Sequence, residues 1–449
     1  MNIEYQPKLE QTQLIDQKKD SSKQGQAAAA AGHKAKPEPT KSQPATVAKV
    51  QEKTPSKPAS SPPQYRNAEV ENEINKNKNA ERLELSSMKL NDQDMEIVAY
   101  YAIRNNTIHT NLVLGTWDAD NPIGDEGAQY LAEALKSNKT LTSLWRRKSH
   151  IGDKGAQYLA DALKNNTTLT RLDLSRSEIG DGGAQYLADA LKNNTTLTKL
   201  DLWGNKIGDK GAQYLADVLK NNKTLTHLQL YSNRIREDGA QYLADALKSN
   251  KTLTELELAG NEIGDEGAQY FAVALENNQT LTKLNVFGNQ IGDEGAQYLA
   301  DALKKNTTLT NLELYNNDIR FEGAKYLFDA LKNNSTLTEL TITVKEIGDK
   351  GAQYLVDALK NNTTLTGLRL PSTKIGDEGA KYLANALKDN KTLRTLGLMY
   401  CDIGDKGAQY LADALQTNKR LRQLDLRSNN ISSSLREQLE KKDRRFLLS

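Results

Sequence analysis

Cysteine and histidine are scarce in this sequence of 449 residues, and their scarcity excludes several kinds of site. The single cysteine, Cys401, cannot form an internal disulfide bond, which fits a reducing compartment. Four scattered histidines and one cysteine provide no cluster for nucleophilic catalysis or for a metal, and no phosphate-binding glycine loop is present. We therefore expect no catalytic residues, no metal and no cofactor.

Excess charge and long apolar runs are also missing. The formal net charge is only +2 with 26% charged residues, so a strongly basic surface for nucleic acid is not expected. No stretch approaches the roughly 18 apolar residues of a membrane span, and the first ten residues, MNIEYQPKLE, lack the apolar part of a signal peptide. The sequence predicts a soluble, cytoplasmic protein, and any export would use a route without a cleaved signal peptide.

Proline is concentrated at one end, where eight of the ten prolines fall within the first 63 residues. They are mixed with Lys, Gln, Ser and Thr, and large apolar residues there are few and aperiodic, which predicts a disordered tail over residues 1–78. Between Lys18 and Lys57, nine lysines face three acids. This basic stretch is either a tether or export signal, or simply a solubilising tail.

The rest of the chain is dominated by an internal repeat. From Ile123 the sequence repeats every 28 residues, and residues 123–430 hold eleven such units. One unit reads IGDKGAQYLADALKNNTTLTKLDLWGNK. Positions 6, 9, 10 and 13 have the spacing of one helical face, and the leucines at positions 22 and 24 alternate as in a short strand.

Polar positions of the unit predict where its helix begins and ends. The aspartate at position 3, as in Asp181, is expected to cap the helix that directly follows it. The asparagine at position 16, as in Asn166, is expected to adopt the left-handed conformation that ends a helix. The asparagine at position 27, as in Asn205, is expected to turn the chain back and to tie the loop to its neighbour.

A single unit cannot bury its apolar positions, so stacking of units must do so. Parallel strands pack about 4.8 Å apart and helices about 8 to 10 Å apart, so the stack must bend with its strands inside. We predict an α/β solenoid of horseshoe shape, with a parallel inner sheet and outer helices. Degenerate capping repeats are expected at residues 79–122, and a capping helix is expected at residues 431–449.

The sequence of the repeat resembles that of a known family. The pattern LxxLxLxxN with a helix and a 28-residue period resembles leucine-rich repeats of the ribonuclease-inhibitor type, which also occur in the Ran GTPase-activating protein. The helix wording GAxxLA is similar to the GALA-type repeats of bacterial effectors. The resemblance implies a scaffold that binds a protein, which in the case of an effector would be a host protein. Stimulation of a GTPase is the alternative.

Variation between the units indicates where a partner binds. The helical wording is nearly constant, while positions 21, 23, 25, 26 and 28, on the strand and the loop after it, change from unit to unit. On a concave wall, aromatic residues anchor a protein partner and charged residues select it. Position 25 supplies the aromatic residues Trp203, Tyr231, Phe287 and Tyr315, and position 23 supplies the acidic residues Asp173, Asp201, Glu257 and Glu313. We predict a monomer that binds a protein partner there, although the aromatic residues could instead only shield their neighbours.

The stretch SLWRRKSH, residues 143–150, departs from the repeat. It places Arg146 on a buried leucine position, and the cost of a buried charge predicts that the strand deforms there. Trp145 and Arg147 belong either to a basic contact site for the partner or to a structural patch. In the structural patch, the acidic loop with Asp118 and Asp120 would neutralise the basic strand.

Overall fold

The computed structural model describes residues 62–116 and 121–448, and strands and helices alternate along them. Part of the predicted tail, residues 1–61, lies outside this range. The helices are α2 (Ala68–Lys76), α3 (Asp94–Ile97), the π-helix η1 (Val98–Arg104), α4 (Asp125–Ser137), α5 (Gly152–Leu163), α6 (Asp181–Leu191), α7 (Asp209–Leu219), α8 (Glu237–Ser249), α9 (Gly264–Asn277), α10 (Asp293–Leu303), α11 (Phe321–Asn333), α12 (Gly348–Asn361), α13 (Gly376–Asp389), α14 (Asp405–Thr417) and α15 (Ser433–Lys442). The strands are β1 (Arg82–Glu84), β2 (Asn111–Val113), β3 (Ser143–Trp145), β4 (Arg171–Asp173), β5 (Lys199–Asp201), β6 (His227–Gln229), β7 (Glu255–Glu257), β8 (Lys283–Asn285), β9 (Asn311–Leu314), β10 (Glu339–Ile342), β11 (Gly367–Arg369), β12 (Thr395–Gly397), β13 (Gln423–Asp425) and β14 (Phe446–Leu447).

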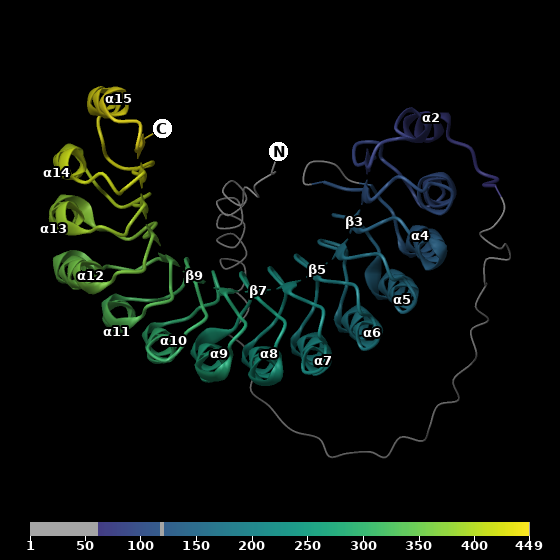
Figure 1. Ribbon diagram of the computed structural model, residues 1–449, viewed down its shortest axis with the longest axis horizontal. Coiled ribbons are helices and arrows are strands. Elements are labelled where there is room, and N and C mark those ends of the chain that lie inside the picture. The colour runs from purple at the N-terminus through teal and green to yellow at the C-terminus, as the bar shows by residue number, and fades with distance from the viewer. Residues whose placement is uncertain (1–61, 117–120, 449) are drawn as a thin grey trace, which may run out of the picture. The chain divides into compact units, whose positions relative to one another are not determined.

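The strands form one parallel sheet, in which each strand pairs with the strands of the preceding and following units. The pairing is in register along the repeat, so that Leu172 lies opposite Leu200 and Leu200 lies opposite Leu228. Within the repeat array, the strands line the inner side of an arc and the helices form its outer layer (Figure 1). The predicted α/β horseshoe of leucine-rich type is confirmed.

The core lies between the sheet and the helices and is built from the same positions in every unit. The isoleucine at position 1, the alanine at position 6 and the leucines at positions 9, 13, 19 and 22 have side chains that are nearly all buried. Neighbouring helices approach closely at the glycine of position 5. A Cβ atom on Gly211 would lie 2.6 Å from the Asp181 carboxylate and 3.2 Å from the Ala184 methyl group.

The aspartate at position 3 caps the helix of the following unit, and the prediction that it caps its own helix is wrong. Asp181 is the first residue of α6, and the residue before it, Gly180, makes no side-chain cap. The Asp181 carboxylate instead accepts hydrogen bonds from the backbone N–H groups of Gly208 (2.7 Å) and Gly211 (2.8 Å), at the start of α7. Stacking decides this, because it places each carboxylate beside the free N–H groups of the next helix.

We expect Asp181→Ala to lower the free energy of unfolding by about 1 to 2 kcal/mol, the usual cost of removing a helix cap. The matched control is Asp189→Ala in the same unit, which removes only an exposed ion pair with Lys192 and should cost less than about 0.5 kcal/mol. Urea denaturation monitored by circular dichroism measures both. Equal losses for the two variants would contradict the role of Asp181 as a cap between units.

The asparagine at position 16 ends its helix in extended rather than left-handed backbone, so that prediction is also wrong. Asn250, for example, has φ −66° and ψ 136°. Its side-chain oxygen accepts from the N–H groups of Thr252 (2.9 Å) and Leu253 (2.7 Å), and its amide donates to the carbonyl of Leu219 in the preceding unit (2.7 Å). These bonds use the whole buried side chain, so the repeated Asn-x-Thr sequence is structural.

The asparagine at position 27 ties each loop to its neighbour as predicted. The Asn205 amide donates to the carbonyls of Leu174 (3.0 Å) and Leu202 (2.9 Å), and its oxygen accepts from the N–H group of Ile179 (3.0 Å). Cys401 occupies the same position near the other end of the array, and its thiol donates to the Leu370 carbonyl (3.0 Å). A thiol can therefore replace the amide as donor.

Both ends of the array differ in part from expectation. Disorder was predicted through residue 78, but residues 68–76 form α2, with Val70 and Ile74 buried. These two side chains lie four residues apart on one helical face, and Asn67 caps the helix through the N–H group of Glu69 (3.2 Å). At the other end, Ser432 caps α15, and the short strand β14 then extends the sheet.

Candidate functional site

The candidate site is the inner face of the sheet. Along each strand the leucine at position 22 points into the core, so positions 21 and 23 point to the opposite face. The repeat register places equal positions of neighbouring units beside one another, so each position forms a column across the sheet.

The aromatic column at position 25 is a chain of ring contacts. The ring centroids of Trp203 and Tyr231 lie 5.7 Å apart, those of Tyr231 and Phe287 lie 6.3 Å apart, and those of Phe287 and Tyr315 lie 5.0 Å apart in a stacked arrangement. Trp203 and Phe287 are only 4% and 6% exposed, while Tyr231 and Tyr315 are half-buried. The structure therefore brings the four predicted residues together, with the two tyrosines as the more accessible members.

The acidic column at position 23 begins with two buried carboxylates on adjacent strands, Asp173 and Asp201. Arg147 pairs with Asp173 through Nε and Oδ2 at 2.7 Å. Asp201 accepts from the Trp203 N–H group (3.0 Å), and the Gln229 amide can be oriented to donate to it (2.6 Å). Burial, together with the charge of Asp173, raises the pKa of Asp201 to about 8.

Further along the same column, Glu257 and Glu313 share one cation. The ammonium of Lys283 lies 2.7 Å from Glu257 and 3.8 Å from Glu313. Burial raises the pKa of Glu313, although the charge of Lys283 acts in the opposite direction. Two half-buried carboxylates with a single ammonium leave an excess of negative charge on this part of the wall.

Arg146 occupies the leucine position of its unit without deforming the strand, so that prediction is wrong. Strand β3 keeps the regular register, with Leu144 opposite Leu172, and the Arg146 N–H group donates to the Asp173 carbonyl (3.0 Å). The backbone bonds of the ladder do not depend on the side chain. The arginine is therefore accommodated by changes at neighbouring positions.

Arg146 is 1% exposed, and its guanidinium lies in the loop beside Ser149, the residue at the asparagine position. It donates to the Ser149 hydroxyl and to the Ile123 carbonyl (2.6 Å), while its Nε has no hydrogen-bond partner. Serine replaces asparagine at position 27 in this unit and the next, and the hydroxyls of Ser149 and Ser177 lie 3.0 Å apart. Serine is smaller than asparagine and leaves room for the guanidinium. Burial lowers the pKa of Arg146 to about 9.

Trp145 and Arg147, the other predicted residues of this stretch, contact the next strand. The Trp145 ring lies 3.7 Å from the guanidinium carbon of Arg171 and 5.2 Å from that of Arg147. Such contacts between a cation and an aromatic face are favourable. Asp118 and Asp120, which were expected to neutralise the basic strand, lie outside the described residues. The two interpretations of this stretch therefore stay predictions.

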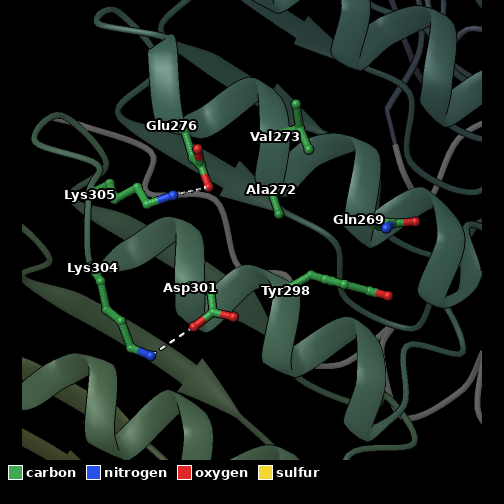
Figure 2. A pocket seen from close by; sticks show the side chains of 8 residues that line it. All are labelled: Gln269, Ala272, Val273, Glu276, Tyr298, Asp301, Lys304 and Lys305. Atoms are coloured by element: carbon green, nitrogen blue, oxygen red, sulfur yellow. Dashed lines mark hydrogen bonds and ion pairs between the residues drawn. The ribbon is translucent and has the colours of Figure 1, made fainter.

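The outer layer carries one feature that the sequence interpretation missed. A hollow of about 360 Å³ lies between α9 and α10 (Figure 2), and Val273 in it is 47% exposed. Every other unit has an acid or an amide at this position, and the lysine three residues later is replaced by Glu276, which pairs with Lys305 (2.9 Å). The helical sequence is otherwise nearly constant, so these two substitutions in one unit were the signal in the sequence that could have pointed to the hollow.

Residues 62–116 and 121–448 contain neither a metal site nor a membrane span. No group of three or more His, Cys, Asp or Glu side chains there is arranged to hold a metal ion. Within the same residues, no helix combines the length and apolar character that crossing a bilayer requires.

Comparisons with known proteins agree with the repeat. A family model described as a leucine-rich repeat matches residues 119–132, 165–188, 277–300, 305–328, 361–384 and 389–412. A second model, described as the TMOD/LMOD leucine-rich domain, matches residues 178–286. No curated protein matches the chain significantly. The sheet, the helices and these matches define the chain as a leucine-rich-repeat solenoid.

Two solved structures illustrate what the chain is similar to. One is actin-binding site 2 of leiomodin-1, at 24% identity and a TM-score of 0.30, covering 33% of this chain and 86% of that one. The other is the complex of Rad7 and Elc1 in yeast, at 17% identity and a TM-score of 0.45, covering 82% of this chain and 84% of that one.

Proposed function

We propose that this chain is a non-catalytic scaffold that binds one protein partner on the inner face of its sheet. The observation that carries the proposal is that the structure brings the variable positions together on one face. They lie on or directly after the strands, where the four aromatic residues are in contact beside the acidic column. The sequence of the outer helices is nearly the same in every unit. The units therefore differ from one another mainly in the side chains on the inner face.

The finer parts of the proposal follow from the repeat type. The 28-residue period supports repeats like those of ribonuclease inhibitor, and the GAxxLA motif supports an effector that acts on a host protein. We further propose that the chain works as a monomer in the cytoplasm. The resemblance to the Ran GTPase-activating protein supports stimulation of a GTPase as the alternative. A GTPase assay with the captured partner separates the two, because simple binding leaves the hydrolysis rate unchanged.

Affinity capture with the full chain tests the proposed surface. We expect Tyr231→Ala combined with Tyr315→Ala to lose the captured partner, because truncating a central anchor typically costs roughly 2 kcal/mol or more. The matched control is Tyr214→Ala with Tyr298→Ala, which truncates the helical tyrosine of the same two units. Adding Trp203→Ala and Phe287→Ala should complete the loss.

Each variant should first be shown to melt cooperatively, because Trp203 and Phe287 are buried. Normal capture by a folded inner-face variant, or loss of capture by the outer control, would contradict an inner-face site.

A further inference from the structure

The balance of acidic and basic residues on the inner face differs between two parts of the array. In residues 235–346, the variable positions 21, 23, 25, 26 and 28 contain seven acids and one base, Lys283. We call this part the acidic wall; its acids are Glu255, Glu257, Glu262, Glu313, Asp318, Glu339 and Glu346. The same positions in residues 123–234 contain seven Lys or Arg residues and three acids. The charge therefore changes sign about one third of the way along the repeats.

Cations within the chain neutralise the acidic wall only in part. Lys283 serves both Glu257 and Glu313, and Arg369 from the following unit pairs with Glu339 (3.0 Å). At the outer positions of the wall, Lys345 pairs with Asp318, and Arg236 pairs with Glu262 (3.6 Å). Glu255 pairs with His227 (2.9 Å), which carries charge only when protonated. The carboxylates at positions 21 and 23 are partly withdrawn from water, so a further cation would interact with them more strongly than in bulk solvent.

An apolar strip lies beside these carboxylates. The stacked rings of Phe287 and Tyr315 belong to the same part of the array as Glu257 and Glu313. Cationic and apolar side chains can therefore contact the wall side by side.

We propose that the acidic wall binds a basic segment of the partner protein, whose Lys or Arg side chains face Glu257 and Glu313 and whose apolar side chains lie on Tyr315, which is stacked on the buried Phe287. The argument is charge complementarity. The excess of acids at the variable positions lies within residues 235–346, so the basic segment is expected to bind on this part of the sheet. This inference rests on the proposed function and adds the chemistry of the partner.

The probe is a synthetic 12-residue peptide of alternating Lys and Leu, titrated into the full-length protein by calorimetry. Its comparison is the same peptide with Glu in place of Lys. We expect only the Lys peptide to bind, with an affinity that falls as salt is added. Glu257→Gln combined with Glu313→Gln should weaken its binding about tenfold, since both charges that face the segment are lost.

The matched control is Glu266→Gln with Glu294→Gln, which removes two exposed acids from the outer helices α9 and α10. It should change the affinity less than about twofold, because scattered surface charges are screened. Equal weakening by both double variants, or equal binding of the Glu peptide, would overturn the inference. If the inner charges prove irrelevant while the Tyr231 and Tyr315 variant still loses its partner, this inference fails and the proposed function stands.

Discussion

Arg146→Leu should make the protein more stable, raising the free energy of unfolding by roughly 1 to 4 kcal/mol, as often happens when a buried charge is replaced by a packed apolar side chain. Leucine fills the equivalent position in the next two units, at Leu174 and Leu202. Within residues 62–116 and 121–448, no carboxylate forms an ion pair with the buried Arg146 side chain, and its Nε has no hydrogen bond. Burial lowers its pKa to about 9, so the folded state disfavours the charge that arginine carries at neutral pH.

The substitution leaves no new polar group without a partner. The Ile123 carbonyl keeps the His150 N–H group as a donor (3.1 Å), and the Ser149 hydroxyl keeps that of Ser177. Urea denaturation at neutral pH measures the change. The control is Arg234→Leu, at an exposed loop position, which should stay within about 0.5 kcal/mol of the native protein. A less stable Arg146→Leu variant would show that the guanidinium bonds outweigh its desolvation.

Asp201→Asn should change how stability depends on pH. The pKa of Asp201 is raised from 3.8 to about 8, so between these values the folded state holds a proton that the unfolded chain releases. The contribution of Asp201 to stability is therefore largest at acid pH and falls as the pH rises towards 8. Asparagine cannot ionise, and its side-chain oxygen can still accept from the Trp203 N–H group. The variant should lose this decline and be the more stable protein at pH 8.

One titrating group changes stability by at most about 1.4 kcal/mol per pH unit, which denaturant titrations at a series of pH values resolve. The matched control is Asp425→Asn, at position 23 of the last unit, where the buried carboxylate pairs with Arg427 (2.6 Å). That variant should lose stability at neutral pH and keep the decline with pH. An unchanged pH profile for Asp201→Asn would show that this carboxylate is ionised in the folded protein.

The sequence by itself determined the architecture. The period of 28 residues, the helical spacing of Ala and Leu and the alternating leucines fixed the strands, helices and core, because every unit must bury the same apolar face against its neighbours. The same pattern identified the inner face and the column that contains Trp203, Tyr231, Phe287 and Tyr315. It also identified Arg146 as an anomaly. These features depend on spacing along the chain, which the sequence contains in full.

Only the tertiary structure decided which groups meet across units. Asp181 caps the following helix rather than its own, Asn250 donates back to the preceding unit, and Arg146 keeps its strand in register by using space that Ser149 and Ser177 leave. The ion pairs that Lys283 makes with both Glu257 and Glu313 likewise join side chains from different strands. A periodic sequence gives each residue its place within a unit. Its partners depend on distances between stacked backbones, and those exist only once the units have packed.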